Sequence, residues 1–250
     1  MHVGLQGGMN ALLIAEICGQ SAAVAMLKEQ YVARALPLPV YEDLAEGKER
    51  VQKAWRDAGN VVVLDHAASG ALYEDYTMLF GNFNTFKADV KLSAAKFYYE
   101  LEIKHIQGIA QFGWATEGFE SSTVHGHTCM HREGVGDNAF SWGFDGVRVR
   151  KWGDGSRSAF GVEWREGDVL GLACDVVNKT VSFSVNGSFE PPLGVAFDKI
   201  VGDSIAPAFS ANLGFKVVAN FGKLPLKHAP PDETYVSVHT AAQKHTAAQK

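Results

Sequence analysis

The period of the hydrophobic residues changes at Gly59. Before that point, apolar residues recur at three- and four-residue steps over 9–36 and again over 43–58, which predicts two helices. PLP at 37–39 ends the first run, and Gly59 is a C-terminal stop for the second. One face of the second helix carries Leu44, Val51, Trp55 and Ala58. Residues 1–58 therefore read as a helical extension, too small to be stable alone, that docks on the rest of the chain or on a partner.

After Gly59 the chain consists of short apolar runs punctuated by glycine. FYYELEI at 97–103 is the clearest run, because its odd-numbered residues are apolar while its even-numbered ones are Tyr98, Glu100 and Glu102. This alternation predicts a strand with one buried and one solvated face. Further strands are predicted at 61–65, 108–115, 147–152, 168–176, 180–185, 205–211 and 215–221. Asn178-Lys179 and Asn186-Gly187 are turn signals. Residues 59–222 are thus expected to be all-β, an antiparallel β-sandwich.

The tail at 223–250 is marked by prolines and ends in two copies of HTAAQK, at 239–244 and 245–250. Two copies are too few for a solenoid. We expect a solvated extension or a frayed helix there.

The charge balance argues against nucleic acid and anionic membranes as partners. The formal net charge is −5 and the isoelectric point is near 6.0, so the chain has no overall attraction to a polyanion. Only VRVRKW at 147–152 is locally basic, and Arg148 and Arg150 are expected on a solvated strand face. The apolar stretch 9–26 contains Glu16 and lacks a basic leading segment, which favours a helix over a signal peptide or membrane span.

The three cysteines indicate a reducing compartment. Cys18, Cys129 and Cys174 are odd in number and show no CxxC spacing, so neither a disulfide framework nor a structural zinc site is expected. The expected location is intracellular, in the cytoplasm. Cys174 lies mid-strand among apolar residues and is expected to be an inert core thiol.

Several segments, taken in order, resemble the SPRY domain family. They are KFYYELEI (96–103), IAQFGWAT (109–116), GVGDNAFSWGFDGVRVRKWGDG (134–155), WREGDVLGLACDVVNKTVSFSVNG (164–187), IAPAFSA (205–211) and VVANFG (217–222). The resemblance implies a concanavalin-like jelly roll that binds a protein or peptide through loops at one end, as an adaptor or subunit of a larger assembly. The chain departs from the family pattern in its long, histidine-rich connection at 117–133 and in its amino-terminal helices.

The resemblance to SPRY modules that clasp short peptides also places a ligand rim. It comprises Lys87, His131, Arg132, Asn212, Leu213 and Gly214. Their chemistry suits a ligand, because Arg132 offers a planar donor fork, Leu213 an apolar contact, and Gly214 close backbone approach. The alternative is that these are ordinary loop residues without a ligand.

Two other kinds of chemistry, glycoside hydrolysis and metal binding, have candidate residues in this chain. Glu100 and Glu102 would lie about 7 Å apart on one strand face, near the spacing that glycosidases use, but that face reads as solvated. No GxSxG, P-loop, HExxH or GxGxxG motif occurs, so we expect no enzyme and no cofactor. His125, His127, Cys129 and His131 could project to one side, but strict alternation spreads them too far apart for one metal ion. No metal is expected.

A lectin-like sandwich is the alternative function. It would bind sugar through Asp137, Asn138 and an aromatic platform at Trp142. The other tryptophans of the sandwich, Trp114, Trp152 and Trp164, are expected to pack in the core or at its rim.

Overall fold

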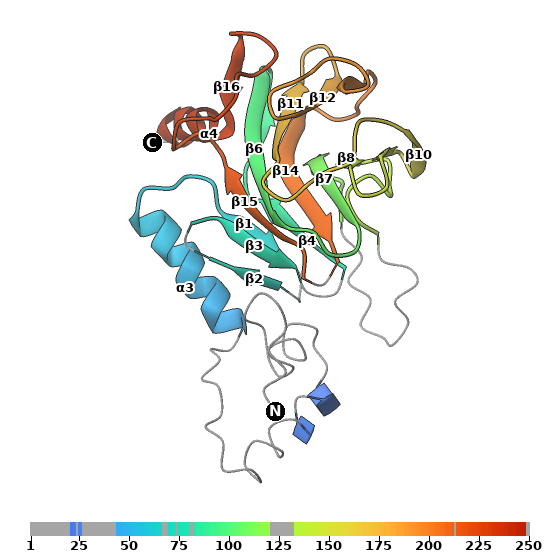
Figure 1. The fold of residues 1–250 in the computed structure, drawn as a ribbon. Coiled ribbons are helices and arrows are strands. Elements are labelled where there is room, and N and C mark those ends of the chain that lie inside the picture. Colours follow the sequence, from blue (N-terminus) through green and yellow to red (C-terminus); the bar gives the residue numbers. More distant parts are fainter. Residues whose placement is uncertain are drawn as a thin grey trace.

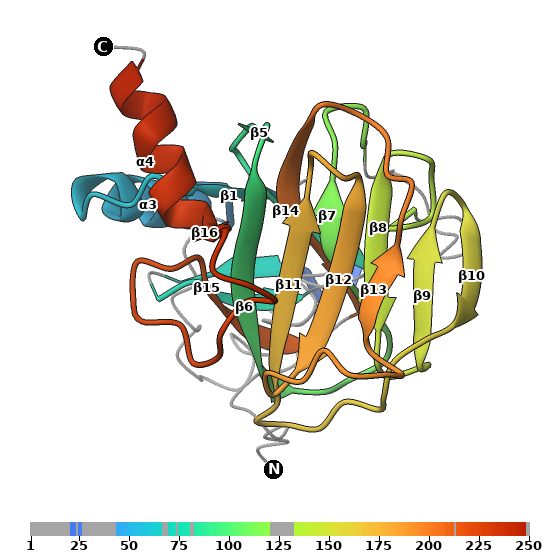
Figure 2. The same cartoon turned by 90° about the horizontal axis from the view of Figure 1, so that it is seen from above.

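The computed structural model describes residues 21–23, 25–26, 44–66, 70–73, 75–80, 83–120, 133–212 and 214–248. Two sheets of mainly antiparallel strands lie face to face (Figures 1 and 2). Sheet A has the order β1 (Leu64–His66), β4 (Asn84–Ala88), β14 (Ser204–Ala211), β7 (Ala110–Ala115), β8 (Ser141–Asp145), β9 (Arg150–Gly153) and β10 (Ser156–Ala159), with β5 (Leu92–Ser93) beside β14. Sheet B has the order β13 (Gly194–Phe197), β12 (Thr180–Val185), β11 (Val169–Asp175), β6 (Lys96–His105), β15 (Lys216–Asn220), β3 (Thr77–Phe80) and β2 (Gly70–Leu72), with β16 (Tyr235–Ser237) beside β6.

The β-sandwich expected from the sequence is confirmed. Strands β6, β7, β11, β12, β14 and β15 lie within one or two residues of the predicted runs. Lys179 and Asn186 adopt positive φ, 58° and 52°, as turns after strands require. Strands β2, β3, β4, β5, β10, β13 and β16 were not predicted, because most of them are only two to four residues long and show too little alternation to recognise.

The core lies between the sheets and is rich in aromatic rings. Phe112 of sheet A stacks on Trp164, with ring centroids 5.3 Å apart, and Trp114 and Trp164 are buried, as expected. The Tyr99 hydroxyl of sheet B donates to the Gly113 carbonyl of sheet A at 2.5 Å, so the buried hydroxyl is satisfied. These contacts join the two layers and fix their relative position.

Helix α3 (Leu44–Asp57) docks on the sandwich. Val51 and Trp55 are buried in the main core, and the Trp55 ring stacks on Tyr76 at 4.6 Å. The Gln52 amide donates to the Leu64 carbonyl. The predicted second helix is therefore confirmed, although Ala58 is exposed. Of the predicted first helix, 9–36, only 21–23 and 25–26 are described, and they are helical.

The C-terminal segment packs against sheet B, so the expected solvated extension is wrong, whereas the alternative of a helix at the HTAAQK copies is confirmed at Val238–Ala248. Strand β16 pairs in parallel with β6, and α4 (Val238–Ala248) follows it. Val238 and Ala242 belong to the main core. We call residues 223–242 the C-terminal strap.

The strap covers the face of β6 that the sequence suggested was solvated. Glu100 is 2% exposed, and its two carboxylate oxygens accept the backbone N–H groups of Lys227 and His228 at 2.8 and 2.7 Å. Tyr98 is buried as well. Alternation within FYYELEI correctly identified the core-facing residues, but the opposite face is also buried because a distant part of the chain folds over it.

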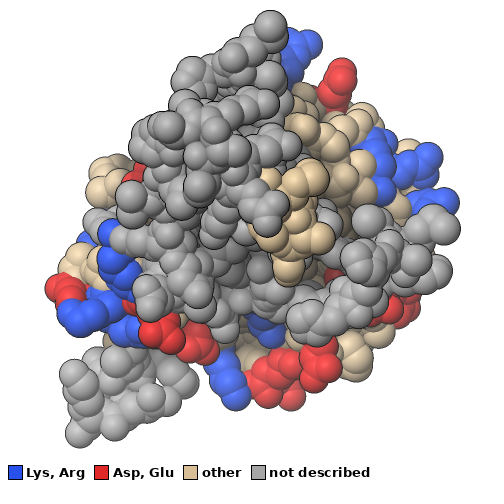
Figure 3. Space-filling view, turned by 90° about the horizontal axis from the view of Figure 1, so that it is seen from below, with Lys and Arg blue, Asp and Glu red and all other residues tan. Residues whose placement is uncertain are grey.

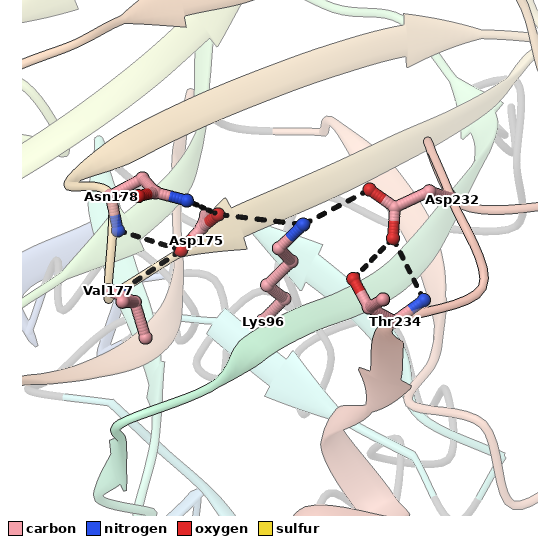
Figure 4. A network of polar contacts seen from close by, with 6 residues as sticks. All are labelled: Lys96, Asp175, Val177, Asn178, Asp232 and Thr234. Atoms are coloured by element: carbon pink, nitrogen blue, oxygen red, sulfur yellow. Dashed lines mark hydrogen bonds and ion pairs between the residues drawn. The ribbon is translucent and has the colours of Figure 1, made fainter.

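An ion-pair network holds the strap to the sheet (Figure 4). Lys96 of β6 lies 3.1 Å from Asp232 of the strap and 3.7 Å from Asp175 of β11. Asp175 also accepts hydrogen bonds from Asn178, and Asp232 accepts them from Thr234. The Lys96 amine thus bridges the sandwich and the strap.

A second correction concerns 147–152, predicted as one strand. Residues 146–149 form a turn and β9 begins at Arg150. Val149 has φ 52°, and Arg148 turns back to pair with Asp145. Arg148 and Arg150 therefore do not share one solvated strand face.

Candidate binding surface

The outer face of sheet A is the face that turns away from sheet B. One row of cross-strand neighbours crosses it: Lys87, Ala208, Gly113, Gly143, Trp152 and Arg157. Polar and charged side chains stand at both ends of this row, and two glycines lie side by side at its centre. The row therefore has no side chains at its two central positions and a basic residue at each end.

Gly143 at the centre of the row, and Gly136 in the segment that precedes β8, let that segment lie close against the sheet. A Cβ on Gly143 would lie 3.0 Å from the Val135 carbonyl oxygen, and a Cβ on Gly136 would lie 2.3 Å from the Trp152 carbonyl oxygen. Val135 is fully buried and packs with Ala115, Phe119 and Ala208 in a small second core. Residues 134–137 thus lie directly on the outer face because glycine removes the side chains that would obstruct them.

Polar groups hold this segment in place. The Val135 N–H donates to the Ser210 hydroxyl at 2.9 Å, and that hydroxyl contacts Thr85 at 2.7 Å. Asp137 accepts the Gln111 amide at 3.0 Å and the Gly134 N–H at 2.8 Å. These bonds connect the loop before β8 to β4, β7 and β14. Residues 134–137 are therefore firmly held against sheet A.

The turn between β14 and β15 lies at the end of sheet A where Ala211 pairs with Asn84 and Ala110. The Asn212 N–H donates to the Ile109 carbonyl at 3.0 Å, and the Gly214 N–H donates to the Phe80 carbonyl at 2.9 Å. Gly214 has φ +87°, and a Cβ there would lie 2.1 Å from Gln107 Oε1. Glycine is therefore required at this position. Asn212 and Gly214 sit together in a tightly tied turn.

Lys87 does not lie in a loop. It is in β4 opposite Ala208, whereas Asn84 is the β4 residue opposite Ala211, next to the turn. Its amine donates to the Thr116 carbonyl at 3.1 Å and lies over the Phe119 ring. Burial lowers the pKa of Lys87, and Glu117 and Asp89 oppose that shift. The structure thus places Lys87 within the outer face, away from the turn.

The other predicted rim residues, His131, Arg132 and Leu213, lie outside the described residues, as do His125, His127 and Cys129. The described part of the chain holds no cluster of three His, Cys, Asp or Glu side chains suited to a metal ion.

Two buried amides at this end of sheet A were not singled out from the sequence. Asn84 is 8% exposed, and neither its Oδ1 nor its Nδ2 has a hydrogen-bond partner among the described residues. Gln111 is 2% exposed, and its Oε1 likewise lacks one. A buried amide without a partner is costly. A polar residue inside an apolar strand, as in AQFGWA, was the signal that could have identified Gln111.

The residues of the alternative functions have structural roles. Trp142 is buried and packs in the main core, so it offers no platform for a sugar. Asn138 accepts hydrogen bonds from the Phe140 N–H and the Ser141 hydroxyl. Glu100 binds the strap, and Glu102 pairs with Lys104 and Lys227. Burial also raises the pKa of the Cys174 thiol, as expected of an inert core thiol.

Comparison with known proteins gives consistent results. A family model of the SPRY domain matches residues 96–224, more than half of the chain. The E3 ubiquitin-protein ligase RKP of Arabidopsis thaliana is 33% identical over 150 residues, and the ATP-dependent RNA helicase Ddx1 of Drosophila melanogaster is 29% identical over 159 residues. These alignments cover 58% and 61% of this chain but only 11% and 19% of the relatives.

Among solved structures, the SPRY domain of human HERC1 is similar, with a TM-score of 0.49 and 16% identity. That alignment covers 62% of this chain and 94% of the HERC1 domain. Within the described residues, no helix has the length and apolar character needed to span a membrane.

Proposed function

Because the chain belongs to the SPRY domain family, whose members are generally protein-interaction modules, we propose that it is a non-catalytic module that binds a peptide or protein surface. The binding elements are loops at one end of the sandwich. The proposed rim comprises Lys87, His131, Arg132, Asn212, Leu213 and Gly214.

The convergence of two loops at one end of sheet A carries this proposal. A Cβ on Gly134 would lie 2.6 Å from the Phe83 ring, and Phe83 directly precedes β4 where β4 pairs with the end of β14. The residues that follow β14 form the turn that contains Asn212 and Gly214. Arg132 lies two residues before Gly134 in the chain, which supports a rim shared by both loops.

Lys87 has a different part in this proposal. Its amine is engaged with Thr116 and lies over Phe119, so it supports the connection after β7 instead of extending into solvent. We therefore expect Lys87 to position the loop that carries His131 and Arg132, and the direct contacts to come from the loops.

The proposal is tested by replacing Arg132 and Leu213 together by alanine. Partners are captured from cell extract with the intact chain, identified by mass spectrometry, and their affinity is then measured. We expect binding of the main partner to weaken at least about tenfold, roughly 1.4 kcal/mol, because an arginine fork and an apolar anchor are lost. The melting temperature should stay nearly unchanged.

A matched control replaces Val195 and Lys199 by alanine. Both are exposed side chains on or beside β13, away from the rim. This control should bind as the parent chain does. Undiminished capture by the Arg132 and Leu213 variant would show that the rim assignment is wrong.

The alignments cover only a small fraction of each relative's length, and this supports a second part of the proposal. The same module occurs as a small part of much longer proteins, so we propose that this chain acts as an adaptor or a subunit of a larger intracellular assembly, in the cytoplasm, without binding nucleic acid or membrane. Size-exclusion chromatography of the tagged chain from cells should show it well above its own 27.1 kDa. Elution only at that mass would contradict the assembly.

A further inference from the structure

The far edge of sheet A carries a concentration of positive charge. Four basic and two acidic side chains lie between Asp145 and Ala159, in a chain whose formal net charge is −5. Figure 3 shows Lys and Arg side chains gathered at the right-hand side of the molecule, the side on which Figure 2 places β9 and β10. We call the group of Arg148, Arg150, Trp152 and Arg157, together with β10, the basic edge.

Trp152 is the centre of the basic edge. The guanidinium carbon of Arg148 lies 4.2 Å from the centre of its ring and that of Arg157 lies 5.4 Å away, within the range of cation–π attraction. Arg148 is also paired with the buried Asp145. Arg150 and Arg157 are exposed and have no acidic partner among the described residues. Two arginines are thus available to an incoming anion.

Strand β10 also has a hydrogen-bonding edge that no described strand covers. It is the last strand of sheet A, and all four of its residues are exposed. The Phe160 N–H donates to the Val149 carbonyl, so the alternating antiparallel pattern directs the backbone groups of Ser158 toward β9. The N–H and C=O groups of Arg157 and Ala159 therefore point outward. An extended chain can bind such an edge as a further strand.

The side chains on this edge restrict what can bind. Arg157 pairs with Trp152, and Ala159 pairs with Arg150. Because Ala159 carries only a methyl group, the long Arg150 side chain can extend over it toward an added strand about 4.8 Å beyond β10. Anionic side chains two residues apart on that strand would meet Arg157 and Arg150, whereas cationic ones would be repelled.

We propose that the basic edge binds an extended acidic segment of another protein as an added strand, with Asp or Glu at alternate positions. Backbone hydrogen bonds to Arg157 and Ala159 provide the pairing, and the two arginines select the acidic residues. Strands β7, β8 and β9 separate this edge from β14 and the rim at Asn212, so the inference does not depend on the function proposed for that rim.

The probe is a fluorescently labelled peptide of four Glu-Thr repeats, and its binding to the full chain is measured by fluorescence anisotropy. We expect saturable binding that weakens as salt is added, because exposed ion pairs are screened. Replacing Arg150 and Arg157 by glutamate should weaken it at least about tenfold. Lys199→Glu, an equal change of charge per site on an exposed residue elsewhere, should leave it unchanged.

Two further peptides separate strand addition from simple charge attraction. A Glu-Thr peptide whose glutamates are N-methylated carries the same charge but lacks the N–H groups that an antiparallel added strand directs toward β10, and it should bind at least about tenfold more weakly. Four Lys-Thr repeats should not bind. The inference is overturned if the Glu-Thr peptide fails to bind, if the N-methylated peptide binds equally well, or if the Arg150 and Arg157 variant binds as the parent does. A loss caused by the Arg132 and Leu213 variant would also overturn it, because the peptide would then occupy the rim.

Discussion

Single residues in the left-handed backbone region mark the turns of the sandwich. Lys179 and Asn186 occupy turns that the sequence signals. Val149, with φ 52°, is different, because a β-branched side chain is strained in this conformation. The turn it belongs to brings Arg148 against Asp145 and Trp152. The backbone strain at Val149 is therefore a local cost that is offset by the contacts of Arg148 with Asp145 and Trp152.

Val149→Asn is expected to stabilise the chain, because asparagine tolerates positive φ. The gain should be about 1 kcal/mol in the free energy of unfolding, measured from the denaturant midpoint. Val195→Asn is the control, since Val195 is exposed and has no positive φ, and it should give no gain. A loss of stability in Val149→Asn would show that the valine contributes more by packing than it costs in strain.

At the scale of elements, the C-terminal strap depends on a few polar groups of β6. Glu100 accepts two backbone N–H groups, and Lys96 pairs with Asp232. A buried carboxylate with two donors is strongly held, whereas partly exposed ion pairs contribute little. Glu100 should therefore matter more to the strap than the neighbouring Glu102.

Glu100→Gln should lower the free energy of unfolding by about 1–3 kcal/mol, because the glutamine amide cannot accept the second N–H group. Glu102→Gln is the matched control. Its pairs with Lys104 and Lys227 are partly exposed, so its loss should cost about 0–1 kcal/mol. Chemical denaturation of both variants compares them, and equal losses would contradict the assigned role of Glu100.

The contribution of the start of helix α4 to stability should depend on pH. Burial lowers the pKa of His239 below its usual 6.5, and Lys223 acts in the same direction. The unfolded chain therefore binds a proton more readily than the folded chain, so this contribution to stability is present above pH 6.5 and is lost as the pH falls below it. His239→Gln should reduce the fall in melting temperature between pH 7 and pH 5. An unchanged fall would exclude His239 as its source.

At the scale of the whole molecule, the core extends beyond the sandwich domain proposed from the sequence, residues 59–222. Val51 and Trp55 of α3 and Val238 and Ala242 of α4 belong to the same core cluster as the sandwich. Trp55 is 1% exposed. The two helices therefore cover apolar surface that the strands alone leave open.

Expressed alone, residues 59–222 should be less stable than residues 44–248 by at least about 3 kcal/mol, since loss of a buried tryptophan alone costs about that much. Circular dichroism should show a β-rich spectrum with a lower melting temperature, or aggregation through the uncovered surface. Identical melting of the two fragments would show that the helices are accessory to the fold.

The all-β class, the core-facing residues of β6 and the two signalled turns follow from the amino-acid sequence alone, because alternation and turn chemistry are local properties of a strand and its ends. The sequence also carried the family resemblance. The burial of Glu100, the place of Lys87 within a sheet face and the position of β10 at the end of the described strands of sheet A became evident only from the folded structure. Each of these three features depends on which distant segment of the chain covers a given face or edge. The local sequence pattern does not indicate that segment.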